Sequence, residues 1–217
     1  MKLYITRYLQ LQSNRLVLNG TVDWGWEEQG VESVLRSIYR RYGIHYPKFY
    51  KMDNLSKLGF LSAEILFQGT DVLKGYPEEG IGIVLGNASS SLETDRKHQE
   101  SIGDRNDYFA SPSVFVYTLA NIMIGEMAIR HKMKGENALF ISEQFAPALI
   151  FQVVSELFQN ERVDCCLTGW IECCDQRFES FLCLVERADR IKRLKKPGEW
   201  FIFDLSNLEQ CFFERKY

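Results

Sequence analysis

The residues with the most potential for covalent or metal chemistry are six cysteines, all in the last quarter of the chain. They form two adjacent pairs and two single positions, with no C-x-x-C spacing: Cys165, Cys166, Cys173, Cys174, Cys183 and Cys211. Because neighbouring side chains on a strand point to opposite faces, adjacent thiolates do not converge on one metal ion. We therefore expect no metal, and we interpret the cysteines as reduced, buried apolar groups. We also expect no cofactor, because the glycines at 80, 82 and 86 lie within a predicted strand and do not open a helix as in a dinucleotide-binding loop.

Composition restricts the function further. The 217 residues are 46% hydrophobic and 25% charged, which is typical of a folded globular protein and excludes disorder and coiled coil. A net charge of −3 supplies no positive field for nucleic acid. The beginning of the chain lacks an apolar signal region, and the longest apolar stretch, residues 114–129, is too short for a membrane span. We expect a cytoplasmic protein with no membrane span.

Short apolar segments alternate with helical patterns, which favours an α/β fold with a largely parallel sheet. The segment 146–158 is apolar around almost its whole circumference, so we expect that helix to be buried against a second chain or layer. The predicted strands are 3–11, 80–85, 138–142, 163–168, 181–185 and 200–205. The clearest predicted helices are 54–67, with Asp53 as N-cap, 114–131, and 146–158, with Pro147 in its first turn.

Three stretches occur in a fixed order: GIVLGNASSS at residues 82–91, residues 111–135, and DCCLTGWIE at residues 164–172. Together they resemble the N-terminal half of β-ketoacyl synthases of the thiolase superfamily. The resemblance implies a three-layer, half-thiolase α/β fold with a mixed five-stranded sheet flanked by helices. It assigns residues 1–186 to the synthase-like domain and residues 187–217 to a C-terminal extension packed on the same domain.

In that family the nucleophilic cysteine lies nine residues after one glycine of the pattern, and a second glycine lies 25 residues after the cysteine. Counting from Gly135 and from Gly169 leads to the same residue, Gln144. An amide has no ionisable thiol, so acyl transfer through this position is excluded and we assign no catalytic residue. The resemblance implies that the family's two catalytic histidines belong to a second, similar half, which we do not expect in these 217 residues.

The degenerate position has neighbours that define a candidate pocket: Glu143, Gln144, Phe145 and Asn121. Phe145, Pro147 and Ala148 replace the small residues that normally follow the nucleophile, which counts against an oxyanion hole. A glutamine at this position is similar to the chain-length-factor subunits that pair with active ketosynthases.

The resemblance implies a non-catalytic accessory protein of fatty-acid, polyketide or aryl-polyene-type biosynthesis. Such a protein would form a homodimer, or a heterodimer with a catalytic ketosynthase. Two alternatives stay open: an acyl or small-molecule binding protein that uses the degenerate pocket, and a glutamine-type malonyl decarboxylase that needs a partner chain. A basic run could dock an acidic acyl carrier protein or could be a solvated surface: Arg187, Arg190, Lys192, Arg193, Lys195 and Lys196.

Overall fold

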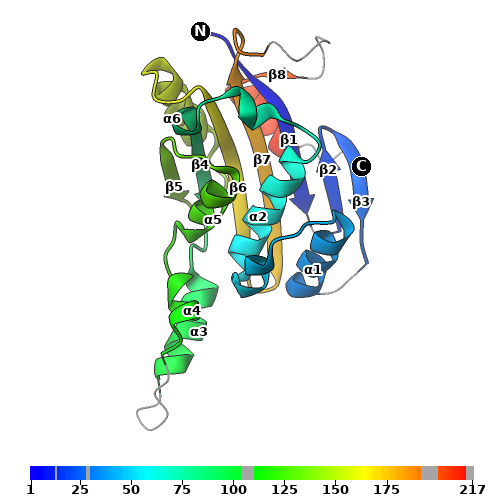
Figure 1. The fold of residues 1–217 in the computed structure, drawn as a ribbon, viewed down its shortest axis with the longest axis vertical. Helices are drawn as coiled ribbons and strands as arrows, with labels where there is room; N and C mark the ends of the chain where they lie inside the picture. Colours follow the sequence, from blue (N-terminus) through cyan, green and yellow to red (C-terminus); the bar gives the residue numbers. More distant parts are fainter. Residues whose placement is uncertain (13, 28–29, 104–109, 192–199, 214–217) are drawn as a thin grey trace.

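The computed structural model describes residues 1–12, 14–27, 30–103, 110–191 and 200–213. These residues form one mixed sheet with helices on both faces (Figure 1). Its strands are β1 (Leu3–Gln12), β2 (Arg15–Leu18), β3 (Thr21–Gly25), β4 (Ile81–Asn87), β5 (Asn137–Ile141), β6 (Cys165–Cys174), β7 (Arg177–Arg187) and β8 (Phe201–Ile202). The mixed α/β class predicted from the sequence is confirmed.

The sheet has the order β3-β2-β1-β7-β6-β4-β5 in the described residues, with β8 paired to β1. Among the described residues the sheet has eight strands instead of the predicted five, because the β2–β3 hairpin extends it beyond β1 and β8 also pairs with β1. The expectation of a largely parallel sheet is wrong. In the part of the chain that the structure describes, β4–β5 and β4–β6 are the parallel pairs, whereas the other strand pairs, including β6–β7 and β1–β7, are antiparallel.

The two faces of the sheet carry separate apolar cores. Helices α1, α2 and α5 cover one face, and α6 and α7 cover the other. The helices are α1 (Val31–Arg41), α2 (Asn54–Phe67), α3 (Leu92–Ile102), α4 (Pro112–Val116), α5 (Ile122–His131), α6 (Pro147–Gln159) and α7 (Leu205–Phe213), with the 3-10 turns η1 (Pro47–Lys51), η2 (Val72–Gly75) and η3 (Glu78–Gly80). Among the described residues, no helix is long and apolar enough to cross a membrane.

Helix α2 is buried along almost its whole length, and its bounds match the sequence prediction. The Asp53 carboxylate accepts a hydrogen bond from the Ser56 backbone N–H at 2.9 Å, which satisfies one of the free donors of the first turn. Asp53 also accepts a bond from the Thr94 hydroxyl at 2.9 Å. This cap therefore joins α2 to α3.

The single helix predicted over residues 114–131 is wrong, because the chain forms α4 and α5 with a turn between them. The turn buries Tyr117, whose hydroxyl donates to the buried carboxylate of Glu126 at 3.0 Å. Lys48 lies 2.8 Å from the same carboxylate. The buried Glu126 carboxylate thus has both a hydroxyl donor and an ammonium partner. Because an unpaired buried charge is costly, these contacts favour the turn over a continuous helix. Helices α3 and α4 extend as an arm away from the sheet (Figure 1).

Helix α6 begins with Pro147 at its first position, as predicted. Within this chain it is not buried on every side, because only Ile150, Val154 and Phe158 are fully buried. Helix α7 packs beside α6 and covers part of its apolar surface, with Leu208 and other residues of α7 in the same core. Burial of the remaining surface by a second chain stays a prediction.

Candidate functional site

Gln144 lies in the short loop between β5 and α6. The loop is tied to the end of β4 by a bond from the Ser142 N–H to the Asn87 carbonyl at 3.0 Å. The Ser142 hydroxyl donates to the Gln144 carbonyl at 2.8 Å, and the Gln144 side chain is exposed. The loop therefore sits beyond the carboxyl ends of two parallel strands, the place where α/β sheets commonly bind ligands.

Phe145 anchors this loop. It is 5% exposed, and its ring centroid lies 4.4 Å from that of Phe212, 5.9 Å from Phe181 and 6.2 Å from Trp170. The ring points into the core shared by α6 and α7, so the side chains of residues 144 and 145 have opposite environments. Pro147 has no N–H, which leaves one donor fewer at the start of α6 to stabilise an oxyanion.

A cavity of about 360 Å³ lies beside Gln144. Its walls combine aromatic rings, carboxylates and amides: Gln12, Ala88, Glu143, Gln144, Phe145, Trp170, Glu172, Glu179, Phe212 and Phe213. The predicted pocket residues Glu143, Gln144 and Phe145 are thus brought together. Asn121 is exposed at the N-cap of α5 and does not line this cavity.

Glu172 closes one side of the cavity. Its Oε2 accepts bonds from the backbone N–H groups of Ala88 and Ser89 at 2.7 and 3.0 Å, and from the Asn87 amide at 3.0 Å. Its Oε1 is buried and has no hydrogen-bond partner among the described residues. The carboxylate therefore holds the turn after β4 through Oε2, whereas Oε1 is buried without a hydrogen bond to offset its loss of hydration.

Glu179 lies directly opposite Glu172 in the β6–β7 register and accepts a bond from the Trp170 indole N–H at 2.9 Å. With Glu143, three carboxylates line the cavity, and no lysine or arginine does so among the described residues. Like charges repel, so this lining disfavours an anionic substrate group such as a malonyl carboxylate.

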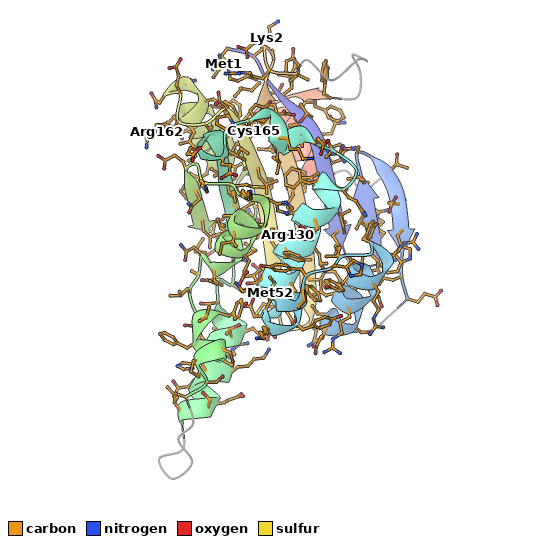
Figure 2. The ribbon with its side chains drawn as sticks, in the orientation of Figure 1. Met1, Lys2, Met52, Arg130, Arg162 and Cys165 are labelled. Carbon is orange, nitrogen blue, oxygen red and sulfur yellow. The ribbon has the colours of Figure 1, made fainter. Side chains whose placement is uncertain are left out.

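None of the cysteines lines the cavity, and within the described residues no other thiol, hydroxyl or imidazole does. Burial raises the pKa of Cys166 to about 12 and raises that of Cys183 well above its usual value. Cys165 is also buried, on β6 (Figure 2). These thiols are not poised as nucleophiles. In the part of the chain that the structure describes, no group of three or more His, Cys, Asp or Glu side chains is arranged to hold a metal ion.

The basic run is only partly described. The Arg187 guanidinium contacts Asp189 at 3.1 Å, and Arg190 lies 3.6 Å from Asp164. The remaining candidate docking residues, Lys192, Arg193, Lys195 and Lys196, lie outside the described residues.

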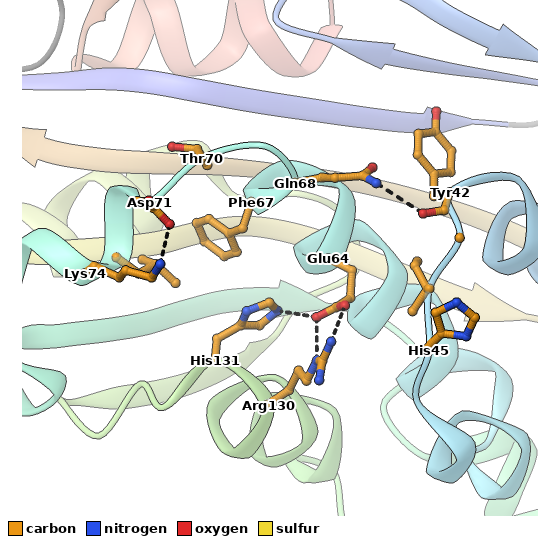
Figure 3. A pocket seen from close by; sticks show the side chains of 13 residues that line it. Tyr42, His45, Glu64, Phe67, Gln68, Thr70, Asp71, Lys74, Arg130 and His131 are labelled. Carbon is orange, nitrogen blue, oxygen red and sulfur yellow. Dashed lines mark hydrogen bonds and ion pairs between the residues drawn. The ribbon is translucent and has the colours of Figure 1, made fainter.

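A second cavity, of about 550 Å³, lies on the opposite face of the sheet, between α2, α5 and the turn after α1 (Figure 3). Glu64 is at its centre, where it contacts both Arg130 and His131. The sequence resemblance did not point to this cavity, because its residues belong to segments far apart in the chain that carry no motif.

Solved structures with a similar architecture were found. The ishigamide ketosynthase/chain length factor aligns with a TM-score of 0.69 at 17% identity, over 89% of this chain and 64% of that one. The fold is that of ketosynthases and chain length factors. A ketosynthase in complex with its chain length factor from Xenorhabdus doucetiae gives a TM-score of 0.55 at 14% identity, over 87% of this chain and 80% of that one.

The third similar structure is a complex of a type II polyketide synthase acyl-carrier protein with its ketosynthase. It aligns with this chain with a TM-score of 0.58 at 12% identity. That match covers 87% of this chain and 63% of the other. This chain thus spans under two thirds of the length of the ishigamide structure, at 64%, and of the acyl-carrier-protein complex, at 63%. No protein-family model and no curated protein matches the sequence.

The ketosynthase-like fold confirms the resemblance at the level of architecture. Sequence reasoning located the loop at residues 143–145 but missed Glu179 and Phe212 as cavity residues. Glu179 had only a weak signal, because it lies two positions before Phe181, the first residue of the predicted strand 181–185, and a longer strand would place both side chains on one face. Phe212 had none, since its helix reaches the cavity only through tertiary packing.

Proposed function

We propose that this chain is a non-catalytic, ketosynthase-like subunit that pairs with a catalytic ketosynthase in fatty-acid, polyketide or aryl-polyene-type biosynthesis. The observation that carries the proposal is the position of Gln144. It stands in a ketosynthase-like fold in the loop between β5 and α6, where the resemblance places the nucleophile, and no thiol, hydroxyl or imidazole side chain lines its cavity among the described residues.

The surface along β5 supports pairing with a second chain. Strand β5 ends the sheet, so its outer edge has no strand partner among the described residues. Large exposed apolar residues lie on β5, on α4 and in the turn after α4: Ile141 at 53%, Phe115 at 55% and Leu119 at 52% exposure. An unpaired strand edge beside exposed apolar groups is typical of an association surface. We infer that a partner adds to this edge.

The partner is identified by affinity pull-down of the tagged chain from its native cells, with the mass of the complex determined. A full-length ketosynthase in fixed ratio supports the proposal, and recovery of the chain alone contradicts it. Ile141→Asp should abolish co-purification. Val22→Asp is the matched control, because Val22 is 59% exposed on β3, at the opposite edge of the same sheet. Equal co-purification of both variants would exclude the β5 edge.

An acyl carrier protein is the second partner that we propose, because one of the similar structures is a ketosynthase bound to its acyl-carrier protein. Charge-neutralising substitutions across Arg187, Arg190, Lys192 and Lys196 should weaken carrier binding in the purified complex while leaving the subunit ratio unchanged. Carrier affinity unchanged by these substitutions would locate docking elsewhere.

The cavity beside Gln144 supports an alternative function, the binding of an acyl chain or small molecule. Its aromatic wall of Phe145, Trp170 and Phe212 would contact an apolar ligand. The acidic lining counts against the decarboxylase alternative, since malonyl groups are anionic. Native mass spectrometry of the protein purified from its own cells distinguishes a bound ligand from an empty cavity.

A further inference from the structure

The second cavity contains a side-chain arrangement that the proposed function does not use. Glu64 on α2 and Arg130 on α5 form a two-bond ion pair, with Nε to Oε1 at 2.8 Å and Nη2 to Oε2 at 2.9 Å (Figure 3). The Nε2 of His131 lies 3.1 Å from the same Oε1. One carboxylate thus holds two basic side chains in place.

All three side chains line the cavity, and Arg130 is the most exposed of them. Glu64 and His131 are each 12% exposed, whereas Arg130 is 35% exposed. The Arg130 guanidinium also lies 5.2 Å from the ring of Tyr46, and the His131 ring packs edge-on against Phe67 at 5.1 Å. Glu64 engages Nε and Nη2 and leaves Nη1 to another acceptor.

Further basic groups come from other elements of the fold. Lys74 on η2 and His45 after α1 also line the cavity. The lining therefore contains one lysine, one arginine and two histidines, together with two carboxylates, Glu64 and Asp71. Lys74 pairs with Asp71 at 2.6 Å, but both side chains are largely exposed, so water screens this pair and an anion competes readily for the ammonium group.

We propose that this cavity binds a phosphate monoester of a small organic molecule. A dianionic phosphate suits a cavity whose lining includes both a guanidinium held in orientation by Glu64 and a flexible ammonium group, that of Lys74. The cavity volume, about 550 Å³, is typical of pockets for organic ligands and well above the space that a phosphate group fills. Phe67 and Leu73 give an apolar wall for the organic part. The proposal is independent of pairing through β5.

The test is a calorimetric titration of the purified chain with phenyl phosphate, inorganic phosphate and phenol at constant ionic strength. We expect phenyl phosphate to bind most tightly, because it satisfies both the basic groups and the apolar wall. Absence of phenyl phosphate binding would overturn the site, and equal affinity for inorganic phosphate would overturn the assignment to an organic ester.

Variants separate a specific site from a general charge effect. Lys74→Gln should weaken phenyl phosphate binding about threefold, as expected for an exposed charge. Lys132→Gln is the matched control, because Lys132 is a similarly exposed lysine close by, paired with Glu78, and does not line the cavity. Arg130→Gln, checked for folding by circular dichroism, should weaken binding more than about tenfold. Equal losses for Lys74→Gln and Lys132→Gln would overturn the proposal.

Discussion

Replacing Phe145 with alanine should destabilise the protein strongly, although the next residue is the exposed Gln144. Phe145 is 5% exposed and contacts three aromatic rings, of which Phe212 at 4.4 Å is the nearest. Truncating a buried phenylalanine costs about 3–5 kcal/mol, because apolar contacts are lost and a cavity remains. This is a large part of the free energy of unfolding of an ordinary domain, about 5–15 kcal/mol.

The assay is urea unfolding followed by circular dichroism and by tryptophan fluorescence. With a urea dependence of about 3 kcal/mol per molar, the midpoint should fall by about 1 M or more. Phe115→Ala is the matched control, since it makes the same change at a side chain that is 55% exposed. Gln144→Ala should change stability by less than about 0.5 kcal/mol. A loss for Phe145→Ala no larger than that for Phe115→Ala would refute the anchoring of this loop.

Two further predictions concern ionisation. Gln144→Cys should gain one iodoacetamide adduct relative to the wild type by intact-protein mass spectrometry, with Gln144→Ser as control; no extra adduct would show that position 144 is covered. Burial by itself raises the pKa of Glu64, but the contacts with His131 and Arg130 outweigh it and lower the pKa to about 2. Because this lies below the ordinary value of 4.5, the ionised carboxylate stabilises the fold above that pH, and the contribution is lost as pH falls toward 2. Urea unfolding of Glu64→Gln at several pH values should therefore show lower stability at pH 7 and a flatter decline from pH 4.5 to 2. A decline as steep as that of the exposed-site control Glu156→Gln would contradict this role.

Local sequence signals predicted the elements whose causes are local. Helix α2 follows from the Asp53 cap and a long apolar run, and α6 follows from Pro147 and its apolar pattern. The break between α4 and α5 could not be predicted in this way. It depends on Tyr117 and Lys48 reaching the buried Glu126, and Lys48 comes from a distant segment.

The sequence by itself determined the α/β class, the ketosynthase-like order of motifs and the glutamine at position 144, because these depend on residue types and on spacing along the chain. Tertiary structure alone decided the number of strands, the packing of α7 beside α6 and the convergence of Glu143, Glu172 and Glu179 on one cavity. It also joined Glu64 to Arg130 and His131. Such contacts connect residues that are tens of positions apart in the chain. Their energies depend on burial and on distances in three dimensions, and the hydrophobic periodicity of a single segment carries no information about either.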